Sequence, residues 1–121
     1  MDLAAIPWRT TRYPGVGIHF YATDERTGRV VCLIRMDPGH GYPRHRHRGA
    51  EDLLVLLGGY RDERGEYRAG TYVHHPDGSS HAPVALDGPG AEVCVLLAVA
   101  HEGIELQGDG TQKHRGPDQR G

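Results

Sequence analysis

Three histidines and a glutamate near the middle of the chain have types and spacing that suit a metal site. His45 and His47 are two residues apart, so on a β-strand both side chains point to the same face. Glu51 follows after a short turn, and His81 comes later in the chain. Imidazole binds zinc, copper, iron and nickel, and a carboxylate extends the choice towards manganese. The spacing therefore predicts metal binding on a β scaffold.

The same four residues permit two kinds of metal chemistry. Three neutral imidazoles and one carboxylate around a divalent ion leave a net charge of about +1. In a six-coordinate site two positions remain open for water, a substrate or dioxygen. In a tetrahedral zinc site the four side chains close the coordination sphere, which is the pattern of structural zinc. The ligand set alone therefore permits either catalysis or binding.

The chain around these residues alternates between short β-rich runs and clusters of glycine and proline. The expected strands cover residues 16–22, 29–36, 51–57, 71–75, 81–86 and 92–100, with a hairpin over 60–68. No run between these breaks has the period of an amphipathic helix. Residues 51–57 form an apolar run typical of a strand buried on both faces. The pattern predicts an all-β sandwich or barrel.

Length and composition predict one domain in an aqueous compartment. The 121 residues divide into an N-terminal arm over 1–15, a main domain over 16–100 and a flexible polar tail over 101–121. Mean hydropathy is -0.57, and no apolar run is long enough to cross a bilayer, so we expect no membrane partner. The net charge of -2 argues against nucleic acid as a partner. The first residues do not resemble a signal peptide, which predicts a cytoplasmic protein with Cys32 and Cys94 as buried free thiols.

Further polar residues are candidates for neighbours of the metal. The possible pocket residues are His74, His75, Tyr42 and Tyr72. His74 and His75 are adjacent, so a regular strand points only one of them inward, where it would contact a substrate or carry a proton. The two tyrosines either line the pocket or pack in the core. Ser79 and Ser80 precede His81 and either hydrogen-bond a ligand's second nitrogen or stabilise the turn.

Two motifs around the four ligands resemble those of the cupin superfamily. The first, G-x5-H-x-H-x3-E-x6-G, is matched by Gly39, His45, His47, Glu51 and Gly58. The second, G-x5-P-x-G-x2-H-x3-N, is matched by Gly70, Pro76, Gly78 and His81, with Ala85 where the pattern has Asn. The resemblance implies a cupin double-stranded β-helix, a jelly-roll barrel. It also implies that His45, His47, Glu51 and His81 are the metal ligands.

A closer resemblance covers about residues 6–99. The strings PWRTTRYPGVG, HRHRGAEDLLVLLGGYRDERGEYRAGTY and PDGSSHAP are similar to the cupin domain of ChrR-type zinc anti-sigma factors. They are also similar to small stand-alone cupins, some of which are metal-dependent dioxygenases acting on diketones and hydroxyketones. The resemblance implies either an Fe(II) dioxygenase with a small organic substrate or a non-catalytic sensory cupin that binds a metal or a small molecule.

The resemblance carries expectations about the chain's organisation and partners. ChrR-type proteins have a helical zinc domain before the cupin, whereas this sequence has about fifteen residues before its first expected strand, which predicts a stand-alone cupin. The expected cofactor is one divalent ion, with Fe(II) favoured over Zn(II), Mn(II) or Ni(II). The cupin resemblance and the apolar run at 53–57 together predict a homodimer. The segment around Trp8 is the candidate to cross onto the second subunit.

Overall fold

The structure is a computed structural model that describes residues 1–47, 49–101, 104–106 and 113–114, with side chains described for 1–44 and 49–101. Its elements are η1 (Leu3–Ala5), β1 (Arg9–Thr10), β2 (Val16–Asp24), β3 (Arg29–Met36), β4 (His45–His47), β5 (Glu51–Leu57), β6 (Gly59–Asp62), β7 (Gly65–Arg68), β8 (Tyr72–His75), β9 (Ser80–His81), β10 (Val84–Ala85), β11 (Cys94–Ala100), β12 (Ile104–Leu106) and β13 (Lys113–His114). In the described part of the chain η1 is the single helical element, so the all-β prediction is confirmed.

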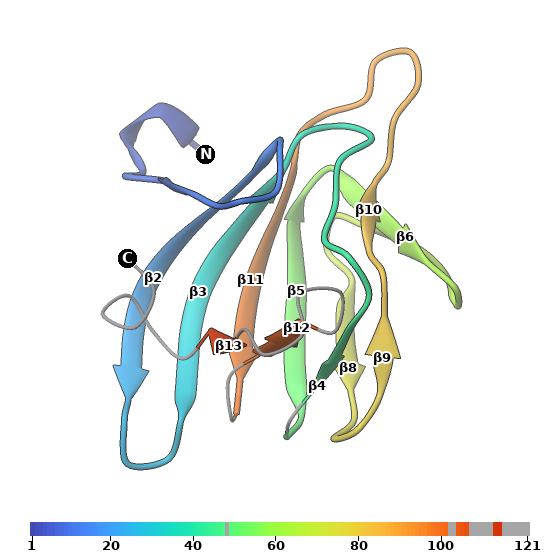
Figure 1. Cartoon of the computed structure of the whole chain (residues 1–121). Helices are drawn as coiled ribbons and strands as arrows, with labels where there is room; N and C mark the ends of the chain where they lie inside the picture. The colour runs from blue at the N-terminus through green and yellow to red at the C-terminus, as the bar shows by residue number, and fades with distance from the viewer. Residues whose placement is uncertain (48, 102–103, 107–112, 115–121) are drawn as a thin grey trace.

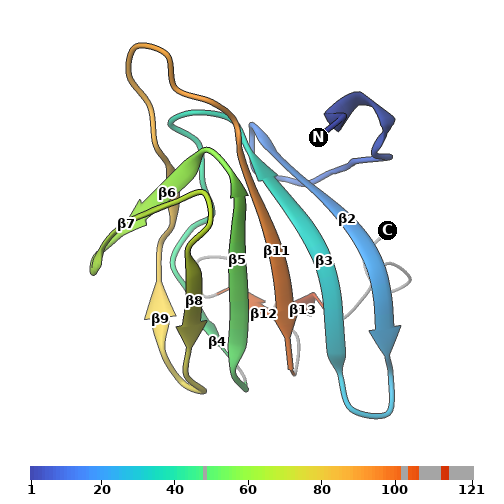
Figure 2. The same ribbon diagram turned by 180° about the vertical axis from the view of Figure 1, so that it is seen from behind.

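The strands form a sandwich whose larger layer is one antiparallel sheet of six strands, in the order β1-β2-β3-β11-β5-β8. The facing layer combines a sheet in the order β13-β12-β4-β9 with a smaller sheet in the order β10-β6-β7. Figures 1 and 2 show the two layers from opposite sides, with the β6–β7 hairpin at one end. Strands β4 and β9 pair within the facing layer, so parts of the two predicted metal-ligand motifs lie side by side.

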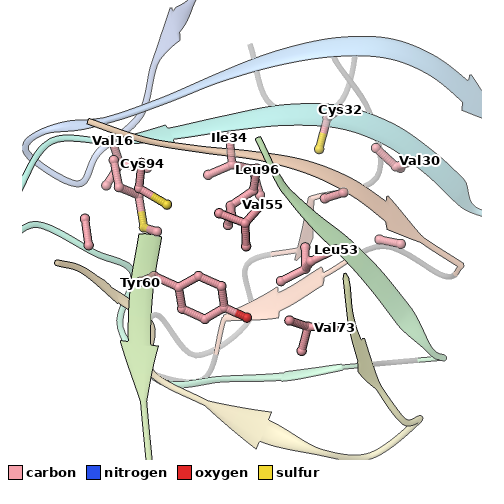
Figure 3. Packing of buried hydrophobic residues seen from close by; sticks show 14 residues of the cluster. Val16, Val30, Cys32, Ile34, Leu53, Val55, Tyr60, Val73, Cys94 and Leu96 are labelled. Carbon is pink, nitrogen blue, oxygen red and sulfur yellow. The ribbon is translucent and has the colours of Figure 1, made fainter. Parts of the chain in front are cut away.

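The core fills the space between the two layers. On β3 the residues Val30, Cys32, Ile34 and Met36 alternate with outward-facing positions, as the two-residue period of a strand requires. They meet inward residues of β5, β8 and β11, and Tyr60 reaches into the same space from β6 (Figure 3). Each fully buried aliphatic side chain contributes about 1.5–3 kcal/mol to stability.

The apolar strand β5 is buried on one face and not on both as predicted. Leu53 and Val55 lie in the core, whereas Leu54 points to the opposite face and is 36% exposed. The prediction was wrong because continuous apolar composition does not reveal how many layers cover a strand. The outer face of β5 is therefore a partly exposed apolar surface.

Most predicted strand positions match the structure. The runs at 29–36 and 51–57 coincide with β3 and β5, and the hairpin at 60–68 is β6 and β7. The run at 81–86 is divided into β9 and β10, because Pro83 between them has no backbone N–H to donate. Gly41 packs beside this break, and a Cβ there would lie 2.0 Å from the Pro83 carbonyl oxygen. Close approach of the two ligand segments therefore requires glycine at position 41.

The first residues pack on the six-stranded sheet of their own chain. The Trp8 indole N–H donates to the Leu3 carbonyl oxygen at 3.0 Å, and the Arg35 guanidinium lies 5.9 Å from the Trp8 ring centroid. At the other end, the predicted polar tail over 101–121 lies largely outside the described residues. No helix in the described part of the chain is long and apolar enough to span a membrane.

Both cysteines are buried free thiols, as predicted. Burial raises the pKa of Cys94 to about 12, and burial followed by the Glu51 charge raises that of Cys32 still further. Neither thiol therefore supplies a thiolate at neutral pH.

Candidate metal centre

Glu51, His75 and His81 are buried polar residues of the interior between the two layers. Their exposed fractions are 3%, 2% and 1%. Glu51 begins β5, where it lies opposite His75 of β8 on one side and Ala100 of β11 on the other. His81 ends β9 in the facing layer, and its ring centroid lies 4.2 Å from that of His75. Such a set of buried imidazoles and a carboxylate suits a divalent cation, because buried polar groups of this kind are retained when they are paired or bind metals.

Strand pairing brings the first predicted motif to the same place. In the antiparallel pair β4–β9, His45 lies directly opposite His81. Directly opposed residues have Cβ atoms about 4.5–5.5 Å apart. His47 lies two residues further along β4, opposite Ile104 of β12. The side chains of His45 and His47 are outside those described, so their coordination of a metal remains a prediction.

Asp62 is a buried carboxylate at this site that the sequence did not predict. Its Oδ2 lies 2.9 Å from Nδ1 of His81, and the exposed fractions of the two side chains are 0% and 2%. Burial alone would raise the pKa of Asp62, but hydrogen bonds from His81 and from the Arg64 backbone N–H outweigh burial and lower it. Asp62, His75 and His81 each offer a ligand atom within 4.8 Å of the others. Among the described side chains, Asp62 is therefore the carboxylate that shares a possible ion site with the two histidines.

A buried tyrosine adjoins the same histidines. The Tyr60 hydroxyl lies 3.4 Å from Nε2 of His75, and its ring lies edge-on to that of His81. Burial, followed by the negative charge of Asp62, raises the pKa of Tyr60. Tyr60 is therefore a neutral hydroxyl at physiological pH. It was not among the predicted site residues because a tyrosine in an amphipathic hairpin carries no motif signal.

Three of the four predicted pocket residues lie on β8 and divide between the two faces of the large sheet. His75 points inward, whereas His74 and Tyr72 lie on the outer face, where both bond the carboxylate of Asp52. The Tyr72 hydroxyl donates to Asp52 Oδ1 at 2.6 Å, and Tyr72 is 64% exposed. Nε2 of His101 lies 3.2 Å from the other oxygen of Asp52. These two predicted pocket residues thus belong to an exposed polar cluster.

Tyr42 lies between the core and the approach to β4. It packs against the core cluster and meets Tyr13 edge-on, with ring centroids 5.9 Å apart. Burial, followed by the nearby Cys32 and Glu51, raises the pKa of its hydroxyl. Tyr42 therefore packs against the core, and its hydroxyl lies near Cys32 and Glu51.

The hydrogen-bond partner of the His81 ring is not Ser79, one of the two serines considered from the sequence. The Ser79 hydroxyl donates to the Pro76 carbonyl oxygen at 2.6 Å, which stabilises the turn. Nδ1 of His81 is instead bonded to Asp62, from a hairpin 19 residues earlier in the chain. The sequence left both roles open for the serines, and the packing of the β6–β7 hairpin supplies the partner of His81 instead.

Comparison with known proteins identifies the family. A family model described as "ChrR Cupin-like domain" matches residues 1–102. The chain belongs to the ChrR cupin-like family. The Anti-sigma-E factor ChrR of Cereibacter sphaeroides is 32% identical over 96 residues, which cover 79% of this chain and 42% of that protein. The chain therefore spans less than half the length of this curated relative.

Solved structures agree with the assignment. The structure of Rhodobacter sphaeroides SigE in complex with the anti-sigma ChrR matches with a TM-score of 0.70 and 33% identity, over 81% of this chain and 51% of that chain. An acetylacetone dioxygenase from Acinetobacter johnsonii matches with a TM-score of 0.66 and 12% identity, over 74% of this chain and 62% of that chain. Identity this low shows a shared fold alone. The predicted cupin jelly-roll fold and the ChrR resemblance are confirmed.

Proposed function

We propose that this chain is a regulatory cupin that binds one divalent metal ion through His45, His47, Glu51 and His81. The observation that supports the proposal is the burial of Glu51 and His81 in facing layers, with His45 directly opposite His81 on the neighbouring strand. A carboxylate and imidazoles that leave water need a partner of opposite charge or hydrogen bonds. A divalent ion would satisfy this requirement for the buried Glu51 and His81.

An ion at this position would connect the two layers of the sandwich. Glu51 belongs to the six-stranded sheet, whereas His45, His47 and His81 belong to the facing sheet. A ligand that binds only the folded arrangement stabilises it in proportion to the logarithm of its concentration over Kd. Loss of the ion would therefore weaken the contact between the layers and would couple the metal content of the chain to its conformation.

A protein partner fits this function better than a substrate alone. The chain is 33% identical to ChrR in the solved complex of SigE with the anti-sigma ChrR. We propose by analogy that the metal state of this cupin regulates its contact with another protein. This analogy rests on the family and not on a surface of this chain.

The Fe(II) dioxygenase predicted from the resemblance is the second candidate. One observation favours it: the Tyr60 hydroxyl and Nε2 of His75 lie 3.4 Å apart beside His81, where they can hold and pass a proton. Iron would supply a Lewis acid and an electron source for dioxygen. The likeness to acetylacetone dioxygenase supports the fold only, because identity is 12%.

Metal analysis combined with oxygen uptake separates the two candidates. Protein purified without an affinity tag should hold one metal equivalent per chain, and His81→Ala should lose it. His19→Ala is the matched control. His19 lies on β2 and pairs with Leu33 of β3, so two strands, β3 and β11, separate it from β5 and Glu51. A full-length protein that binds no divalent metal would overturn the proposed function.

The Fe(II), Mn(II) and Zn(II) forms should then be assayed for oxygen consumption with small β-diketones and 2-hydroxyketones. Tight zinc binding without turnover by any form supports the regulatory function. Turnover restricted to the iron form would assign the dioxygenase instead, because zinc has no accessible redox change. Loss of the diketone or hydroxyketone by the zinc form without oxygen consumption would indicate hydrolysis or isomerisation and would contradict both candidates.

A further inference from the structure

We infer that Asp62 is a positioning residue that fixes the His81 ring so that Nε2, and not Nδ1, is the metal-binding atom. The inference rests on the proposed metal site and adds a residue that neither cupin motif contains. It concerns the hydrogen bond between two buried side chains from different sheets of the facing layer.

The hydrogen bonds of Asp62 determine which His81 nitrogen carries the proton. Asp62 Oδ1 accepts the Arg64 backbone N–H at 2.9 Å and lies 3.4 Å from the Tyr67 hydroxyl. Asp62 Oδ2 lies 2.9 Å from Nδ1 of His81. An ionised carboxylate only accepts hydrogen bonds, so Nδ1 must carry the hydrogen. In the neutral imidazole the lone pair available to a metal is then on Nε2.

The arrangement of strands places the hairpin that carries Asp62 and the strand β4 on opposite sides of the segment that carries His81. The segment containing β9 and β10 runs between the segment that leads into β4 and the hairpin strand β6 (Figure 1). On one side it pairs with β4 and with Gly41, and on the other β10 pairs with β6. The backbone of His45 therefore lies on the β4 side of the segment that carries His81, whereas Asp62 reaches His81 from the hairpin side.

Direct coordination by Asp62 is the competing interpretation. Its carboxylate oxygens lie close enough to His75 and His81 to share an ion with them. A metal bound to Asp62 and to Nδ1 of His81 would have to replace the hydrogen bond that joins these atoms. It would also lie on the hairpin side of His81, away from the β4 side that carries the first motif. The geometry therefore favours orientation over ligation.

Nitrogen NMR of the metal-free protein tests the inference without any variant. In ¹⁵N-labelled protein with chelator, at alkaline pH, His81 should be the Nδ1–H tautomer, which differs from the Nε2–H form usual for free histidine. After addition of zinc, Nδ1 should keep its hydrogen while the Nε2 resonance shifts. An Nε2–H tautomer in the metal-free protein, or loss of the Nδ1 hydrogen on zinc binding, would overturn the inference.

Asp62→Asn gives a second, independent measurement. The Asn oxygen must remain on the Arg64 N–H, which turns the amide NH2 towards Nδ1 of His81. The ring then accepts at Nδ1 and carries its hydrogen on Nε2, the atom that should bind the metal. Zinc affinity in a competition titration with a chromophoric chelator should fall about 10–100-fold, the usual effect of losing such a partner.

Glu66→Gln is the matched control, since it removes one charge from the same hairpin at an exposed position paired with Arg68. Its zinc affinity should stay within about twofold of wild type. Unchanged affinity in Asp62→Asn, or complete loss of zinc from a folded variant, would overturn the inference, the latter by assigning Asp62 as a ligand. If wild-type protein binds no zinc, the proposed function fails, while the metal-free tautomer still decides the role of Asp62.

Discussion

Replacing Glu51 with glutamine should weaken metal binding and leave the metal-free fold intact. Glu51 is 3% exposed and lies opposite His75 and Ala100 at the inner start of β5. Glutamine has nearly the same volume, so the surrounding packing is preserved, as for other volume-conserving substitutions. The variant loses the one anionic group of the predicted ligand set.

The size of the effect follows from binding linkage. At a free zinc concentration of 100 times Kd, binding stabilises the wild type by about 2.7 kcal/mol. A 121-residue chain has an unfolding entropy near 0.25 kcal/mol/K, at about 2.1 cal/mol/K per residue, so this stabilisation raises Tm by about 11 °C. If Glu51→Gln weakens binding about 100-fold, the same zinc concentration stabilises it by about 0.4 kcal/mol, or about 2 °C.

The assay is thermal unfolding with chelator and with zinc, on wild type, Glu51→Gln and the exposed control Glu92→Gln. The control should show the full zinc shift. A Glu51→Gln variant that shows the wild-type zinc shift would refute the assignment of Glu51 as a ligand. A variant that melts far below wild type in chelator would instead show that Glu51 supports the fold itself.

Two further predictions concern the outer face of the large sheet. Hydrogen bonds, first from Tyr72 and then from His74, lower the pKa of Asp52 from 3.8 to about 2, so its contribution to stability is present above about pH 4 and lost as the pH falls towards 2. In Tyr72→Phe the fall in the free energy of unfolding between pH 4 and 2, measured with urea and chelator, should be smaller, and an unchanged pH dependence would contradict this assignment. Leu54 and Tyr72 are exposed on this face, so Leu54→Asp should shift the predicted homodimer to monomer in multi-angle light scattering. Wild-type protein that is monomeric over a wide concentration range would contradict the dimer.

The sequence by itself determined the strands and the family. Glycine and proline flank the short apolar runs, so the positions of β3 and β5 could be read directly, although an apolar run does not show which of its faces is buried. The two spaced motifs carried the cupin assignment, which the family model confirms. The buried positions of Glu51 and His81 agree with those motifs, although coordination itself remains a prediction.

The tertiary structure decided which polar side chains share the interior. His74 and His75 are equivalent in sequence, and the pairing of Glu51 with His75 in one register turns His75 inward and His74 towards Asp52. Asp62 lies in a hairpin tip, where carboxylates are ordinary turn residues. Its contact with His81 arises because β9 and β10 run between β4 and β6, which places a residue 19 positions earlier in the chain within hydrogen-bonding distance. Local patterns specify which face of a strand a residue occupies, but only the packing of the layers decides what that face meets.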